Sequence, residues 1–173
     1  MKNNMNWNFD NSYSRLSDVF KEHIEPIAVK NPELVLMNKD LVEELNLDFS
    51  KIDKNELAAL FTGNILPEGS NAIAQAYAGH QFGHFTMLGD GRAVLIGEHL
   101  TKNNERYDIQ FKGSGKTAFS RNGDGRAALG PMLREYIISE AMHHLNIPST
   151  RSLAIAKTGE EIMRETPLQG AIL

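Results

Sequence analysis

The chain of 173 residues has no cysteine and no long apolar run. Without cysteine, disulfide bonds, thiolate catalysis and cysteine-ligated zinc are excluded, and the composition fits a reducing compartment such as the cytoplasm. No segment approaches the roughly 20 consecutive apolar residues of a membrane-spanning helix. The first seven residues lack the apolar core of a secretory signal peptide. We therefore expect a soluble, cytoplasmic protein with no membrane partner.

The chain also has no excess of positive charge. It contains 18 Lys and Arg against 22 Asp and Glu, which gives a net charge of −4. Proteins that hold a nucleic-acid backbone usually present a basic field, so we expect no nucleic-acid partner. Apolar residues make up 41% of the chain and charged residues 23%, values that are ordinary for a globular protein with one well-buried core.

Glycine beside basic residues is the most distinctive feature that the chain does have. The pentapeptide Gly-Asp-Gly-Arg-Ala occurs at Gly89–Ala93 and again at Gly123–Ala127, and Gly113–Thr117 (Gly-Ser-Gly-Lys-Thr) lies between the two copies. Glycine lets backbone N–H groups approach an anion, and Arg and Lys supply the charge that phosphate needs. Together the three clusters predict phosphate binding, while any one of them alone is more typical of a hairpin turn.

The segments between the clusters predict an antiparallel hairpin. Ala93–Glu98 is a short apolar run, and Arg106–Lys112 alternates with period two, so that its apolar side chains share one face. A polar turn separates the two segments. Lys112 is therefore expected at the end of the second strand.

Helices are predicted on both sides of this hairpin. In the N-terminal part, Asn38–Leu45 and Lys54–Thr62 are typical of short helices. After the second Gly-Asp-Gly-Arg-Ala, Pro131–Leu145 predicts one long helix. The apolar stripe expected on that helix consists of Leu133, Ile137, Ala141 and Leu145, together with Met132 and Tyr136. A final hairpin is expected to reverse at Thr158-Gly159.

The expected order in this chain is a glycine turn, a strand, a strand ending in lysine and a long helix that bears glutamates. The N-terminal lobe of protein kinases has the same order, and there the glutamate pairs with the lysine and directs it at phosphate. Glu135 is the better-placed partner for Lys112, and Glu140 is the second candidate. We therefore predict an α+β fold with the N-terminal lobe of a protein-kinase-like fold, a twisted antiparallel sheet plus one long helix, at residues 76–173. Residues 1–75 are expected to form an extended and helical annex packed on this lobe.

Several motifs in this order resemble those of the selenoprotein O family (SelO, called YdiU in bacteria). Each motif alone is weak, but jointly they are specific, and they cover nearly the whole chain. The matching segments are Phe9–Tyr13, Tyr77–Gly83, Leu88–Ala93, Phe111–Gly113, Asp124–Ala127 and Arg134–Tyr136.

The resemblance implies a kinase-like protein that binds ATP in a flipped orientation and transfers AMP, rather than phosphate, to hydroxyl side chains of proteins. It implies Glu135 as the partner of the lysine, and Mg²⁺ or Mn²⁺ as the metal. The nucleotide-contacting positions of the family that match this sequence are Gly89, Gly91, Arg92, Lys112, Asp124 and Gly125.

The chain differs from the family in length, because the proteins of the family are much longer. The catalytic Asp, the metal ligands and two further phosphate-binding arginines of the family lie downstream of the position of Leu173. We therefore expect no catalytic residue and no metal ligand in this chain, and we expect the polypeptide to continue into a C-terminal lobe. The chain alone is predicted to have negligible transferase activity.

Three alternatives remain open at this point. Gly113–Thr117 nearly completes a P-loop, but position 110 is Gln where the first glycine is required. His80 and His84 lie four residues apart, yet no third metal ligand has suitable spacing, so structural histidines are favoured. The chain could also be a nucleotide-binding regulatory module, or a gene fragment without a role of its own.

Overall fold

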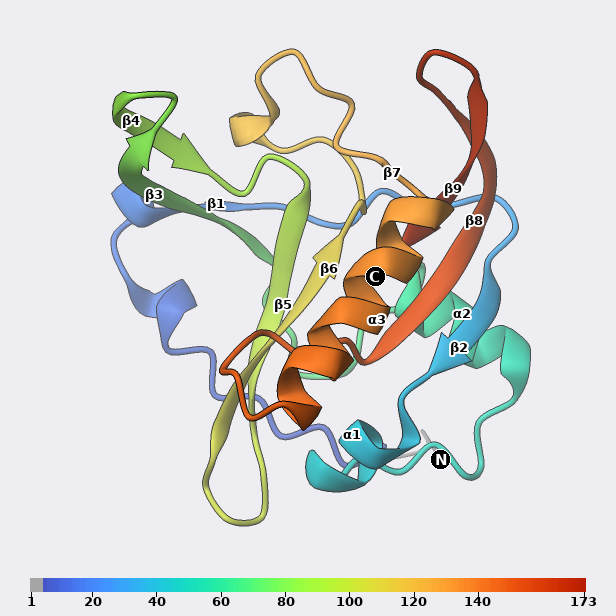
Figure 1. Cartoon of the computed structure of the whole chain (residues 1–173). Helices are drawn as coiled ribbons and strands as arrows, with labels where there is room; N and C mark the ends of the chain where they lie inside the picture. Colours follow the sequence, from blue (N-terminus) through green and yellow to red (C-terminus); the bar gives the residue numbers. More distant parts are fainter. Residues whose placement is uncertain (1–4) are drawn as a thin grey trace.

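A computed structural model of the chain describes residues 5–173, which form an α+β structure of two antiparallel sheets and a few helices (Figure 1). The first sheet has the order β1-β3-β5-β6, with β4 paired to β3, and the second has the order β2-β8-β9-β7. The strands of the first sheet are β1 (Lys21–His23), β3 (Ile73–Gln81), β4 (His84–Gly89), β5 (Ala93–Leu100) and β6 (Arg106–Lys112). Those of the second are β2 (Glu33–Met37), β7 (Ala127–Ala128), β8 (Ala154–Met163) and β9 (Pro167–Ile172).

The helices are short except for one. They are α1 (Lys39–Glu44), α2 (Lys54–Phe61) and α3 (Leu129–His144), together with the 3-10 turns η1 (Tyr13–Arg15), η2 (Asp18–Phe20) and η3 (Ala118–Ser120). Over residues 5–173, no helix has the length and apolar character that crossing a membrane requires.

The two sheets meet at Lys112. Its backbone N–H donates to the carbonyl of Leu173 (2.9 Å), and the N–H of Leu173 donates back to the carbonyl of Lys112 (3.1 Å). The end of β6 therefore lies beside the chain that leaves β9, and α3 lies in front of this junction (Figure 1). Met132 of α3, which is fully buried, packs there with Ile155 and Ala171 of the second sheet.

The predicted hairpin of two strands is confirmed. β5 and β6 pair from Ala93↔Lys112 to Leu100↔Arg106, with a bulge between Leu95 and Gly97. Along β6, the apolar side chains turn toward the core and the intervening polar ones are more exposed, as the period of two predicts.

The two short helices are also confirmed, and their caps explain where they begin. The side chain of Asn38 accepts a hydrogen bond from the N–H of Leu41 at the start of α1. The side chain of Asp53 does the same for the second and third residues of α2. After α2, Gly63 adopts a φ of 78°, a left-handed conformation that ends a helix readily when the residue is glycine.

The predicted apolar stripe of α3 is confirmed in the first half of the helix and wrong in the second half. Ile137 and Leu145 are 63% and 68% exposed, and Ala141 is exposed as well. The predicted members that do pack are Met132, Leu133 and Tyr136, which turn toward the second sheet. A spacing of four residues advances further than one helical turn of 3.6 residues, so a strict i, i+4 row drifts off the face that packs.

The predicted turn at Thr158-Gly159 is also wrong. These residues lie inside β8, where the pairing with β9 shifts register between Lys157 and Glu161. Gly159 has a φ of 70° and lies against Asn31, so the glycine serves a bulge rather than a reversal. The chain reverses between Met163 and Pro167 instead, and β9 is the partner strand.

The first 75 residues contribute one strand to each sheet, β1 and β2. β3 runs across the proposed boundary between residues 75 and 76. The division into an annex and a lobe remains a prediction.

Beyond Tyr136, polar contacts rather than apolar packing hold α3 against its neighbours. Glu140 accepts two hydrogen bonds from Arg151, both at 2.7 Å, and another from Asn38 at 2.7 Å. The side chains of Glu140 and Arg151 are only 15% and 14% exposed. Hydrogen bonding to Arg151 holds the pKa of Glu140 below its ordinary value of 4.5. This network fixes the C-terminal half of α3 to the start of α1.

We predict that Glu140→Gln lowers the free energy of unfolding by about 2 kcal/mol at pH 7, because Arg151 loses the less exposed of its two carboxylate partners, Glu140 and Glu44. Since the pKa of Glu140 is lower in the folded state, the pair stabilises above the unfolded-state pKa, and this contribution is lost as the pH falls through the folded-state pKa. Urea denaturation of both proteins from pH 7 to pH 3 measures the difference. Glu161→Gln, at an exposed position of β8, is the control. A pH-independent difference would contradict this assignment.

Candidate functional site

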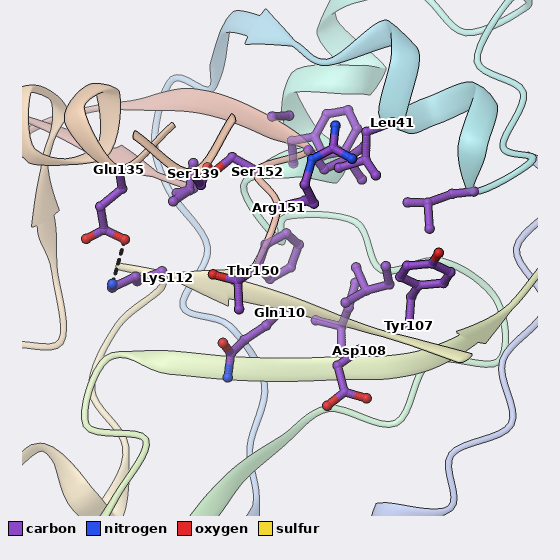
Figure 2. Close-up of a pocket in the computed structure, with 18 of the residues that line it drawn as sticks. Leu41, Tyr107, Asp108, Gln110, Lys112, Glu135, Ser139, Thr150, Arg151 and Ser152 are labelled. Atoms are coloured by element: carbon purple, nitrogen blue, oxygen red, sulfur yellow. Dashed lines mark hydrogen bonds and ion pairs between the residues drawn. The ribbon is translucent and has the colours of Figure 1, made fainter. Parts of the chain in front are cut away.

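A cavity of about 1000 Å³ lies between the face of β6 and helix α3. Figure 2 shows Lys112 and Gln110 on the strand, Glu135 and Ser139 on the helix, and Arg151 in the segment that leads to β8. The inner wall is apolar, formed by Leu41, Leu45, Leu60, Phe61, Ile109 and Leu153. Cations lie on the wall as well, so the cavity combines an apolar interior with positive charge, as ligand sites commonly do.

An ion pair joins the strand and the helix at this cavity. Nζ of Lys112 donates to Oε2 of Glu135 at 2.6 Å, with the two side chains 34% and 36% exposed (Figure 2). Glu140, the other candidate, lies five residues further along α3 and is held by Arg151. The ion pair limits the directions that the flexible lysine can take at the cavity wall.

Arg92 is a second cation on the same cavity wall. Its backbone carbonyl accepts a hydrogen bond from Gly113 (2.7 Å), which holds the residue beside the end of β6. Its side chain is exposed, and in residues 5–173 it makes no hydrogen bond or ion pair with another side chain. The structure therefore brings together three of the predicted site residues, Arg92, Lys112 and Glu135.

The first Gly-Asp-Gly-Arg turn, between β4 and β5, is packed beneath η3. A Cβ atom at Gly89 would overlap the ring of Phe119, and one at Gly91 would lie 2.9 Å from the carbonyl oxygen of Phe119. The hydroxyl of Ser120 donates to the carbonyl of Gly91 (2.5 Å). The close approach of η3 is thus a sufficient reason for both glycines, and their predicted contact with a nucleotide remains a prediction.

The aspartate inside this turn supports the cavity wall, a role that the sequence reasoning did not single out. Asp90 is 7% exposed, and its carboxylate accepts from the N–H of Gln75 (3.1 Å) and from the side chain of Gln110 (3.3 Å). Burial raises the pKa of Asp90 above its ordinary value. Asp90 thereby ties the turn to a side chain of the cavity wall. The only signal in the sequence was a carboxylate between two glycines.

The second Gly-Asp-Gly-Arg turn lies in a different setting, before β7 and α3. Gly125 has a φ of 67°, and a Cβ atom there would overlap the backbone of Gly115. The N–H of Gly115 donates to the carbonyl of Gly125 at 3.1 Å. The carboxylate of Asp124 is bound by Arg164, and neither Asp124 nor Gly125 lines the cavity. The geometry leaves their predicted role untested.

The segment Gly113–Thr117 does not lead into the helix that a P-loop needs at the phosphates. It is followed by η3, which has three residues, and Lys116 is exposed and off the cavity wall. Within residues 5–173, no group of three or more His, Cys, Asp or Glu side chains is arranged to hold a metal ion.

The class of protein follows from comparison with known sequences. Residues 3–173 match the sequence family described as protein adenylyltransferase SelO. The chain belongs to this family.

The relatives that this chain matches include bacterial proteins named protein nucleotidyltransferase YdiU. The chain is 74% identical to the one from Pelagibacter ubique, and the match covers 96% of this chain and 35% of the relative. It is 66% identical to the one from Nitrosococcus oceani, over 96% of this chain and 34% of the relative. The protein from Anoxybacillus flavithermus is 63% identical, over 98% and 35%. The chain thus spans about a third of the length of these relatives.

We predict that Glu135→Gln changes the melting temperature much less than Glu140→Gln does. The Lys112–Glu135 pair is about one-third exposed, and ion pairs in contact with water contribute about 0–1 kcal/mol. Thermal denaturation followed by circular dichroism compares the two variants of the same helix. Equal losses would mean that Glu135 is chiefly a structural residue.

Proposed function

We propose that this chain is the ATP-binding part of a protein adenylyltransferase, which transfers AMP from ATP to Ser, Thr or Tyr hydroxyls of proteins. The observation that carries the proposal is the 2.6 Å ion pair between Lys112 and Glu135 at the wall of the cavity, which Arg92 also lines without pairing with any side chain of residues 5–173. Membership of the SelO family supports the reaction class.

We further propose that the fold is the N-terminal lobe of a kinase-like protein. The Lys112–Leu173 hydrogen bonds connect the sheets, so that β3, β5, β6, β9 and β8 follow one another across the molecule. The helix that bears Glu135 lies between β6 and β8 in the sequence and crosses in front of their junction (Figure 1). A strand lysine paired with a helix glutamate is the arrangement that protein kinases use to hold nucleotide phosphates.

The side chains of this chain would bind and orient the triphosphate. In the proposed reaction the hydroxyl oxygen of the protein substrate bonds to the α-phosphorus, and the bond from that phosphorus to the bridging oxygen of the β-phosphate breaks. Pyrophosphate leaves, and the hydroxyl proton passes to a base. Lys112, aimed by Glu135, and Arg92 would offset the negative charge on the phosphate oxygens. Mg²⁺ or Mn²⁺ would add charge neutralisation when bound, through ligands outside this chain.

The partners in this proposal are ATP, a protein that offers a hydroxyl group, and a second lobe that closes the cavity. The relatives are about three times as long as the chain. A nucleotide held between two lobes would make only part of its contacts with this one, so we propose weak ATP binding and no transfer by the chain alone.

We predict that Lys112→Ala weakens ATP binding at least about tenfold, the loss of one charge-assisted contact to phosphate. Isothermal titration calorimetry with ATP and Mg²⁺ measures the dissociation constant. Lys116→Ala, in the P-loop-like segment, is the matched control and should leave it unchanged. The reverse result would favour the P-loop reading and contradict the proposal.

For catalysis, we predict that the purified chain transfers no label from α-³²P-ATP to protein, whereas a full-length relative such as the Pelagibacter ubique protein does. Denaturing gels with autoradiography give the readout. Transfer by the chain alone would contradict the proposal that this chain binds ATP but does not transfer AMP by itself. Micromolar ATP binding by the purified chain without transfer would instead favour a regulatory module, provided that the source cell lacks a full-length relative.

A further inference from the structure

Strand β6 has an open edge along the cavity. It is the last strand of the first sheet, with β5 on one side. Backbone groups along a strand point alternately to its two sides. Those of Lys112 point away from β5, so those of Gln110 and Asp108 do so as well. Within residues 5–173, no hydrogen bond reaches the N–H or C=O groups of Gln110 or Asp108 on that side. The edge of β6 can therefore accept another strand.

The first pair of such a ladder is already present. The backbones of Lys112 and Leu173 exchange two hydrogen bonds, at 2.9 and 3.1 Å. A reciprocal exchange between two residues defines a hydrogen-bonded pair of antiparallel strands. Along an antiparallel ladder, two steps forward on one strand match two steps back on the other. A strand that continued this ladder would therefore make its next hydrogen-bonded pair with Gln110, and the one after that with Asp108.

The cavity lies where this ladder would continue. One wall is β6, and another consists of residues 149–154, which lead into β8 (Figure 2). The second sheet gives the same register, because Ile172 of β9 faces Ala156 of β8. The first residue of a continuing strand would thus lie between Phe111 and Ala154, which are buried apolar residues. The cavity therefore offers backbone partners on β6 and apolar side chains on one face.

We propose that the cavity receives an extended segment of polypeptide as an added strand, antiparallel to β6. The occupant is the segment that follows the matched third in relatives such as the Pelagibacter ubique protein, of which this chain covers 35%. The pairing of Leu173 with Lys112 favours this source, because it already directs the backbone along the open edge.

The register assigns a face to each residue of the added strand. Its first and third residues face Phe111 and Ile109 and point toward the apolar inner wall of the cavity. Its second and fourth residues face Gln110 and Asp108 and share the side of the sheet on which Lys112 lies. The inference goes beyond the proposed function and does not depend on it. An added strand lies in the plane of the sheet, so the side of Lys112 stays open to a ligand.

The test compares the chain with an extended form. The extension consists of the next eight or so residues of the Pelagibacter ubique relative, about the length of a common strand. One variant has Asn at the first and third added positions, and its matched control has Asn at the second and fourth. An extension of equal length made of Gly and Ser controls for added chain without side chains that pack.

NMR gives two readouts for each protein. The first is hydrogen exchange at the amides of Gln110 and Asp108, with the amides of Phe111 and Ile109, which face β5, as internal references. The second is a nuclear Overhauser contact between the Hα atoms of Phe111 and the first added residue, which lie close together in such a pair.

In the chain alone, we expect fast exchange at Gln110 and Asp108 and slow exchange at both reference amides. The extension should slow exchange at Gln110 and Asp108 at least about tenfold and should give the Hα contact. Asn at the first and third positions should abolish both effects, because it places amide groups against the apolar wall. Asn at the second and fourth positions should retain them, and the Gly-Ser extension should produce neither.

Three results would overturn the inference. The first is unchanged exchange in the extended form, and the second is an equal loss in the two Asn variants. The third is protection of Gln110 and Asp108 in the chain alone that rises with protein concentration, which would make a second copy the occupant. None of these measurements involves ATP, so their failure leaves the proposed function intact, and failure of ATP binding leaves this inference intact.

Discussion

The structure depends on the way in which Lys112 is held at both its backbone and its side chain. The backbone of Lys112 pairs with Leu173 and joins the two sheets, while its ammonium group pairs with Glu135 and joins the sheet to α3. Lys112, Glu135 and Leu173 all line the cavity. A change in how the sheets pack would therefore also move the charge at the cavity wall. The fold and the proposed phosphate site both depend on the position of Lys112.

Local signals in the sequence were sufficient where neighbouring residues decide the structure. The caps at Asn38 and Asp53 and the alternation along β6 gave the elements with nearly correct ends. Long-range packing decided the rest. The exposed face of α3 contains Ile137 and Leu145 because its second half is held by Arg151 and Asn38, and nothing in the helix sequence alone reveals those partners. Gly159 indicated a turn, but a glycine with positive φ serves a bulge equally well.

The candidate site was predictable to a similar degree. Lys112 followed from the order of elements, but the choice between Glu135 and Glu140 needed the position of Arg151, which comes later in the sequence. The identical pentapeptides gave no sign that they occupy unlike surroundings. One lies beneath η3 and leads into β5, and the other is clamped by Arg164 and leads into β7. Asp90 and Asp124, the same residue in the same motif, consequently differ in burial, in partners and in the direction in which their pKa values shift.

The pairing of Leu173 with Lys112 has a practical consequence for work at the bench. Leu173 lines the cavity, so an affinity tag fused to this residue would emerge beside the lysine. A polyhistidine tag there would place imidazoles, and any nickel carried over from purification, next to the proposed phosphate site. Such a preparation could bind ATP through the tag. The tag can be removed with a protease or placed at a distant surface loop such as the β5–β6 turn. Either choice separates ATP binding by the protein from ATP binding by the tag.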